Sequence, residues 1–405
     1  MKLFSLSKKE FILFILFLQS LSGLSCLVFD SVINSYITLI VVFGILFTIF
    51  FGKGAIVSDN YCSRKWLVAF AVLPLFTHIV TALEYDQPYY ESARVMLPHW
   101  LFLIYFILIK KEFNVEGIIK IILILAAAKV IITGAQQITY PNILFSFKVE
   151  NTDDNGFFHT IPQRSGFYRF LLGDAYYLTL FSAIYCYTLL LKKFNRRIFL
   201  LFLLYAFGLY MDQTRQILVS FTICLILLPL LKTGSNKSRY ILFTLLILGL
   251  LYGFSDELFG ELMVETKEDS LEGTSRMIAS SYFLDNTGGF FTSLFGHGFP
   301  YKNSSLGILI DQLNNLHITR CDVGMFGAIH MVGYAFVVTF LLYFLFVVKR
   351  NWKYIDDYLQ LYLISIIINI PLIFPLYNYT VVGIEFFMGM LFWMVDKSII
   401  ANKNQ

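Results

Sequence analysis

Charged residues are scarce in this 405-residue chain: Asp, Glu, Lys and Arg make up 14% of it, against 58% hydrophobic residues. The mean hydropathy of +0.70 means more apolar surface than one soluble core can hide. The small net charge of +4 gives no reason to expect a nucleic-acid partner. The five cysteines form no CxxC pair, so neither a disulfide framework nor a zinc site is indicated.

The sequence is dominated by long apolar runs. A bilayer core needs roughly 20 apolar residues per helix, and about twelve stretches approach that length. We therefore predict an all-α polytopic membrane protein, a single integral membrane domain over residues 1–405, whose N-terminal apolar stretch is an uncleaved helix. The predicted spans have centres near Leu18, Val41, Leu75, Tyr105, Leu125, Leu180, Leu204, Cys224, Ile247, Val338, Ile367 and Met388.

Basic residues orient these spans. With a cytoplasmic N terminus, 21 of the 31 Lys and Arg residues fall on the inner side, nine fall on the outer side, and Lys129 lies within a span. Loop cations resist translocation, so this asymmetry predicts that both termini are cytoplasmic.

Two outward connections are unusually long, and loops of such length often carry function. They cover residues 138–171 and 255–327, and the second contains the sequence SLGILIDQLNNL. In that sequence the apolar residues share one helical face, which predicts a helix that lies on the membrane surface or caps the bundle. These residues are Leu306, Leu309, Ile310, Leu313 and Leu316.

Five arginines face the outer side in this topology, where positive charge is unexpected. An arginine stays charged in a half-dry site, and its planar fork of donors matches phosphate oxygens. Single arginines of this kind also serve as interfacial anchors or offset acidic loops, so the inference depends on the whole set. The set is Arg164, Arg169, Arg215, Arg276 and Arg320.

The order of several short motifs resembles the O-antigen polymerase and ligase superfamily, the Wzy-like membrane proteins. The resemblance covers mainly Arg164 to Tyr334, and the stretches that carry it read RSGFYR, TRQILVSF, SRMIASSYF, SLFGHGF and DVGMFGAIHMVGYAF. Each motif alone is weak, but their order, spacing and placement on one side are more specific.

The resemblance implies a GT-C-like glycosyltransferase of the bacterial inner membrane whose active site faces the periplasm. It implies a polyprenyl diphosphate-linked glycan as substrate, with neither a cofactor nor a required metal, and a chain-length regulator as a possible partner. By position, Arg164, Arg215 and Arg276 engage the lipid diphosphate or the glycan. Arg169, Arg320 and Asp322 are further candidates for substrate binding.

The general base is also a matter of resemblance. Ligases of this superfamily use a histidine near the end of the long outer loop, which points to His317, with Asp322 and the more distant Asp174 as other candidates. His297, between Gly296 and Gly298, is interpreted as a turn residue. Ligases usually have Asn directly after the histidine, whereas here two asparagines precede it in NNLHIT. This departure favours a polymerase.

Three alternatives remain open at this stage. The first is a ligase that transfers the finished glycan to an acceptor. The second is a transporter or flippase for lipid-linked sugars, in which the intramembrane residues Lys129 and Glu385 would act as a coupling pair. The third is a scaffold for an envelope assembly. The long outer segment favours an enzyme over an alternating-access carrier.

Overall fold

A computed structural model describes most of the chain. The described residues are 6–21, 31–52, 60–140, 142, 163–164, 167–168, 175–212, 214–231, 245, 249, 270–316, 318–377 and 382–404. They are almost entirely helical, with one pair of two-residue strands. The chain divides into two compact units. Both contain candidate membrane spans, so the single domain predicted from the sequence stays a prediction.

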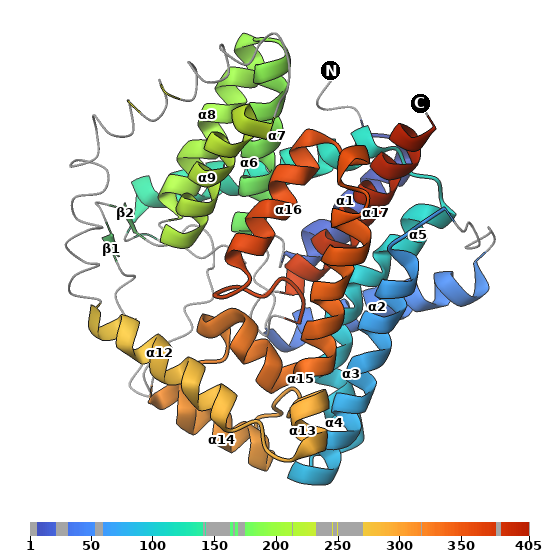
Figure 1. Cartoon of the computed structure of the whole chain (residues 1–405), viewed down its shortest axis with the longest axis vertical. Coiled ribbons are helices and arrows are strands. Elements are labelled where there is room, and N and C mark those ends of the chain that lie inside the picture. The colour runs from blue at the N-terminus through green and yellow to red at the C-terminus, as the bar shows by residue number, and fades with distance from the viewer. Residues whose placement is uncertain are drawn as a thin grey trace. The chain divides into compact units, whose positions relative to one another are not determined.

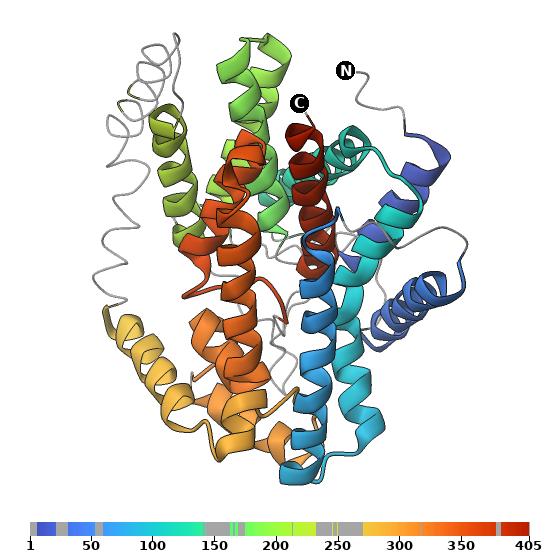
Figure 2. The ribbon, with the colours of Figure 1, turned by 45° about the vertical axis from the view of Figure 1, so that its right-hand side comes forward.

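Unit 1 comprises residues 1–29, 116–270 and 357–368. Its helices are α1 (Lys8–Ser20), α6 (Val115–Thr139), α7 (Tyr176–Lys192), α8 (Arg196–Met211), α9 (Arg215–Leu231) and α16 (Asp357–Asn369), and its strands are β1 (Gln163–Arg164) and β2 (Phe167–Tyr168). Helices α7 and α8 lie side by side (Figures 1 and 2). Gly208 permits close packing here, since a Cβ there would lie 2.3 Å from Val130 Cγ2 and 3.1 Å from Thr179 Cγ2.

Unit 2 comprises residues 30–115, 271–356 and 369–405. It begins with α2 (Ser31–Phe51), α3 (Arg64–Tyr85), α4 (Tyr89–Met96), η2 (Leu97–Leu103) and α5 (Ile104–Lys110). It continues with α12 (Ser270–Asp285), α13 (Phe290–Phe295), α14 (Ser305–Asn315), η3 (Cys321–Val323), α15 (Gly324–Tyr343), η4 (Phe344–Lys349), η5 (Trp352–Tyr354) and α17 (Val382–Lys403).

Four helices within the described residues are long and apolar enough to cross a membrane: Arg64–Tyr85, Tyr89–Lys110, Val115–Thr139 and Gly324–Lys349. They match the spans predicted around Leu75, Tyr105, Leu125 and Val338. The other predicted spans are not confirmed. Helices α1, α7, α8, α9 and α16 have 13 to 17 residues each, and most residues around Ile247 lie outside the described part of the chain.

Two prolines shape the spans of unit 2. Pro74 lies inside α3 and has no N–H, so the carbonyl of Phe70 loses its helical donor. The Tyr377 hydroxyl replaces that donor, at 2.9 Å from the Phe70 oxygen. Pro98 falls where α4 gives way to the 3-10 segment η2, in the middle of the second span. Each proline loosens a helix at a point where other parts of the unit pack against it.

A buried carboxylate holds one end of unit 2 together. Asp396 on α17 accepts hydrogen bonds from the Ser63 N–H, the Ser63 hydroxyl and the Tyr105 hydroxyl. The Tyr343 hydroxyl lies 3.1 Å from Ser63 Oγ. Asp396 thereby ties the start of α3 to α5, α15 and α17. Charge-assisted hydrogen bonds of this kind are what make a buried carboxylate tolerable.

The predicted amphipathic helix in SLGILIDQLNNL is confirmed as α14. Leu306, Ile310 and Leu313 are buried, and Leu309 is partly buried, against Phe283 of α12 and neighbouring apolar residues. The apolar face therefore packs inside unit 2. Leu316 is the exception, because it lies after the last helical turn and is exposed.

Candidate functional site

Residues 295–301, from the last residue of α13 into the link that leads to α14, lie along α3 and are called the connector below. Side chains of α3 bind its carbonyls at every second residue. Thr77 donates to Phe295 O, and Thr81 donates to His297 O at 2.9 Å. A threonine every fourth residue of an apolar helix places both hydroxyls on one face, where they match the two-residue period of an extended chain.

Helix α15 also binds the connector, through backbone carbonyls. Gly333 interrupts the helical backbone of α15 with a φ of 80°. Just before this break, the His330 and Met331 carbonyls accept from the amides of His297 and Gly298, both at 2.8 Å. The interruption therefore provides acceptors for a chain segment that has no secondary structure of its own.

Glycines are required where these backbones meet. Gly296 and Gly298 have φ values of 81° and 88°, a region that favours glycine. A Cβ at Gly298 would lie 1.8 Å from Thr81 Oγ1, and one at Gly296 would lie 2.3 Å from Met331 O. Gly296 and Gly298 thus supply the backbone freedom expected of them, and His297 between them lies at a bend.

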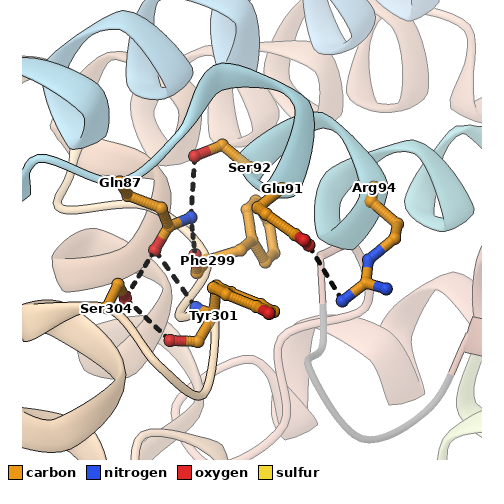
Figure 3. Close-up of polar contacts among 7 residues, drawn as sticks. All are labelled: Gln87, Glu91, Ser92, Arg94, Phe299, Tyr301 and Ser304. Atoms are coloured by element: carbon orange, nitrogen blue, oxygen red, sulfur yellow. Dashed lines mark hydrogen bonds and ion pairs between the residues drawn. The ribbon is translucent and has the colours of Figure 1, made fainter.

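Gln87 fixes the far end of the connector with both ends of its amide (Figure 3). Its Nε2 donates to Ser92 Oγ at 2.7 Å and to Phe299 O at 3.0 Å. Its Oε1 accepts from Tyr301 N at 3.1 Å and from Ser304 Oγ at 2.8 Å. Gln87 is 1% exposed, so these four bonds satisfy an amide that has almost no access to solvent.

The ring of His297 is buried beside a second histidine. It stacks on His330 with ring centroids 4.1 Å apart and planes 18° apart. Its Nε2 lies 3.1 Å from the Asn286 carbonyl, which can only accept, so Nε2 carries the proton. Its Nδ1 accordingly accepts from the Tyr85 hydroxyl. Burial, followed by the charge of Arg320, lowers the pKa of His297 to about 4, and the ring is neutral at neutral pH.

Arg320 is the buried cation of this region. Its side chain reaches the connector, where Nη1 donates to Gly298 O at 2.9 Å, and the residue is 6% exposed. It acts electrostatically on Tyr85 and on both stacked histidines. Gly327 is also needed, because a Cβ there would lie 1.9 Å from Arg320 O. Arg320, His330 and Tyr85 thus lie around the connector at His297 and Gly298.

Another buried polar pair, His99 and Glu385, lies next to the connector residue Phe299. His99 Nδ1 is 3.1 Å from Glu385 Oε1, and the same oxygen accepts from the Tyr377 amide. The His99 ring stacks on Phe299, with centroids 4.8 Å apart, and both rings contact Tyr377, at 5.5 Å and 5.8 Å. The aromatic ring of Phe299 therefore links the connector to an ionisable pair inside the helices of unit 2.

Unit 1 carries its own buried ion pair. Lys129, on the candidate span α6, pairs with Asp212 at the C-terminal end of α8. Asp212 lies three residues before Arg215, the first residue of α9. The transporter hypothesis coupled Lys129 to Glu385, but the structure shows Lys129 bonded to Asp212, and Glu385 bonded to His99 and the Tyr377 amide.

Three residues of the RSGFYR motif, Arg164, Phe167 and Tyr168, belong to a two-stranded antiparallel pair in unit 1. Strands β1 and β2 pair Gln163 with Tyr168 and Arg164 with Phe167. Gln137 of α6 binds the edge of this pair like a neighbouring strand, since its Oε1 accepts from Tyr168 N at 2.9 Å and its Nε2 donates to Tyr168 O. The Phe167 ring lies 5.6 Å from that of Tyr210 on α8. The backbone of Arg164 is thereby held near the end of α8 that carries Asp212.

The predicted site residues fall in both units. Arg276 is exposed on α12, and Asp322 is exposed in η3, where it accepts from the Thr319 hydroxyl. Arg320 is buried as described. Arg164 and Arg215 are placed by their backbones in β1 and at the start of α9. Three residues lie outside the described part of the chain: Arg169, Asp174 and the predicted base His317.

Several residues around the connector were missed in the sequence. Gln87 and His330 were not singled out, and neither was the recurrence of Thr77, Thr81 and Tyr85 at every fourth position. A polar stripe on an otherwise apolar helix was the available signal. Comparisons with known proteins add no further residues, because no family model and no curated protein matches this chain.

Proposed function

We propose that this protein polymerises polyprenyl diphosphate-linked oligosaccharide repeat units into O-antigen, capsule or exopolysaccharide. The observation that carries the proposal is the burial of Arg320 against the carbonyl of Gly298, in the segment that resembles the superfamily motif. Ionisable residues among apolar membrane helices are costly and usually mark a functional site. A guanidinium held in this way suits an anionic substrate.

The reaction transfers a glycan from a diphosphate leaving group to a sugar hydroxyl. The bond between the anomeric carbon and the diphosphate oxygen breaks, and a bond to the hydroxyl oxygen forms. The hydroxyl proton passes to a base, for which His317 is the candidate in this proposal. Negative charge grows on the departing diphosphate, and fixed arginines stabilise it. In this scheme Arg215 and Arg276 act catalytically.

The remaining residues bind substrate in this proposal. Arg164, Arg169, Arg320 and Asp322 contact the diphosphate or the sugars. The strand pair that carries Arg164 supports this role, because Gln137 and Tyr210 fix its position. His297 is not assigned as the base, since both of its ring nitrogens are engaged and its pKa is lowered to about 4.

The cellular setting belongs to the same proposal. We place the protein in the inner membrane of a bacterium, with the reaction on the periplasmic side and a chain-length regulator as a partner. The described helices support the coarser statement that this is a membrane protein.

Deletion of the gene in its host tests the proposal. We expect the surface glycan to collapse from a ladder to a single repeat on a gel, and complementation by the wild-type gene to restore the ladder. Arg215→Ala and Arg276→Ala should fail to restore it. Arg94→Ala is the matched control, because Arg94 is a partly exposed arginine paired with Glu91 at 2.8 Å. A full-length ladder in the deletion strain would refute the proposal.

The same experiment separates two alternatives. Lipid-linked polymer that never reaches its final acceptor would indicate a ligase. The buried Lys129–Asp212 pair is the one observation that favours a transporter, since such pairs mark ion or proton pathways in membranes. Repeat units trapped on the inner leaflet would support the transporter.

A further inference from the structure

Helix α13 lies beside the membrane-spanning part of α3, not beyond its end. The Phe295 ring stacks on Phe76 at 5.1 Å, and Thr77 binds the Phe295 carbonyl. Phe76 lies nine residues before Tyr85, the last residue of this span. At 1.5 Å per residue, the end of α13 is therefore roughly 13 Å inside the end of α3. Figures 1 and 2 both show α13 alongside the final turns of α3.

The surface of α3 at this level requires lipid. Ile79 and Leu83 lie closer to the end of the helix than Phe76, and they are 46% and 72% exposed. Large apolar side chains exposed on one stripe of a candidate span belong in the hydrocarbon layer. Phe76 lies further from the end of α3 than Leu83 does. The end of α13, which packs against Phe76, therefore lies at the depth of Phe76 in the bilayer.

Helix α13 itself presents an apolar surface outward. Phe290 and Phe291 are 74% and 64% exposed, while Thr292 is buried. The start of the helix lies near His297, because a Cβ at Gly288 would be 3.3 Å from His297 Cε1. His297 in turn is bound to Thr81, which lies four residues before Tyr85, the last residue of α3. The start of α13, with its two exposed phenylalanines, therefore lies near the last turn of α3.

The connector that follows α13 meets the main condition for irregular backbone at this depth. Such backbone is tolerated in a membrane only where protein groups satisfy its N–H and C=O groups. The carbonyls of residues 295, 297, 298 and 299 and the amides of residues 297, 298 and 301 all have protein partners. These partners leave the backbone of the connector compatible with a position inside a membrane leaflet.

We propose that α13 is a re-entrant helix that enters the membrane leaflet at the Tyr85 end of α3, where Phe290 and Phe291 contact lipid acyl chains. The sequence places this stretch in an outer loop, so the proposal returns part of that loop to the membrane. It does not depend on the proposed reaction, because it concerns only the position of α13 in the bilayer.

Depth measurement with spin labels tests this. The full chain, with its five cysteines replaced by alanine, receives one nitroxide at a time through Phe290→Cys, Phe291→Cys, Leu83→Cys or Asp285→Cys, in lipid nanodiscs. Leu83 is the lipid-facing reference, and exposed Asp285 on α12 is the aqueous one. We expect labels at 290 and 291 to collide with oxygen several-fold more than with a water-soluble nickel chelate, as at 83. Collision behaviour like that at 285 would overturn the proposal.

A second measurement keeps the native cysteines in place. Benzoylphenylalanine at position 290 preserves an aromatic side chain and crosslinks to whatever surrounds it on illumination. In nanodiscs with acyl-labelled lipid, the proposal predicts a protein–lipid adduct comparable to that from benzoylphenylalanine at position 83. An adduct no greater than that from position 285 would contradict it.

Discussion

Lys129 and Asp212, 83 residues apart in the sequence, form an ion pair inside unit 1 in which the side chains are only 3% and 8% exposed. Lys129 comes from the middle of an apolar span, and Asp212 ends α8. A buried pair of this kind gains little over an apolar replacement, but breaking it leaves a charge in a low-dielectric interior. Asp212 lies three residues before Arg215, the first residue of α9.

Removal of one partner should therefore cost more than removal of both. We expect Lys129→Met to lower the free energy of unfolding by about 3–5 kcal/mol, because the Asp212 carboxylate loses its ammonium. The double variant Lys129→Met, Asp212→Asn should recover most of that loss. Equilibrium unfolding in mixed detergent micelles measures the free energy of unfolding of each variant. Additive losses in the double variant would contradict the pairing.

Gln87 should be a stability determinant of unit 2. Replacing it with Ala removes four hydrogen bonds and leaves the Phe299 carbonyl and Tyr301 amide without the partner they have now. At about 1 kcal/mol per bond, we expect a loss of about 2–4 kcal/mol. Ser305→Ala is the control, since it removes one exposed bond to Tyr85 O and should cost less than about 1 kcal/mol. Thermal midpoints in detergent would compare them, and equal losses would argue against the role of Gln87.

Two glycine-to-alanine changes should have opposite effects. At Gly298 the new Cβ would overlap Thr81 Oγ1 and the positive φ would be strained, so Gly298→Ala should destabilise the protein strongly. At Gly134, inside α6, a Cβ meets nothing within 4 Å, and Gly134→Ala should stabilise by up to about 1 kcal/mol. A chemical-denaturation series on both variants checks this. A neutral Gly298→Ala would mean that the connector is not held as described.

His297 should make stability depend on pH. Its pKa is about 4 in the folded protein, below the ordinary value of 6.5, so the unfolded chain binds the extra proton first as pH falls. Stability from this residue is complete above pH 6.5 and is lost between pH 6.5 and 4, by up to about 3 kcal/mol at roughly 1.4 kcal/mol per pKa unit. His297→Gln should show a smaller fall over that window. Parallel pH profiles for wild type and variant would refute the assignment.

Sequence patterns predicted the features that depend on local chemistry. The apolar runs around Leu75 and Val338 form long helices, and the period of SLGILIDQLNNL predicts the buried face of α14. The glycines of FGHGF adopt the backbone that a close approach requires. In each case the pattern of neighbouring residues indicates the local backbone or the apolar face, although not the partner that it meets.

The centre of the site could not be predicted, because its bonds join residues far apart in the chain. Thr81 meets His297 across 216 positions, and His99 meets Glu385 across 286. A polar residue on an apolar helix indicates that a partner exists but not which one. For the same reason the sequence paired Lys129 with Glu385, where the structure has Asp212.

Reconstitution of the purified protein in liposomes with polyprenyl diphosphate-linked repeat units from its host tests the central claim most directly. The account predicts a ladder of glycan lengths, with one polyprenyl diphosphate released per new linkage. Arg215→Ala and Arg276→Ala should slow it about 100-fold or more, while Arg94→Ala behaves as wild type and all three keep their thermal midpoints. A preparation that is folded yet forms no linkage, or a ladder that is unchanged in both variants, would contradict it.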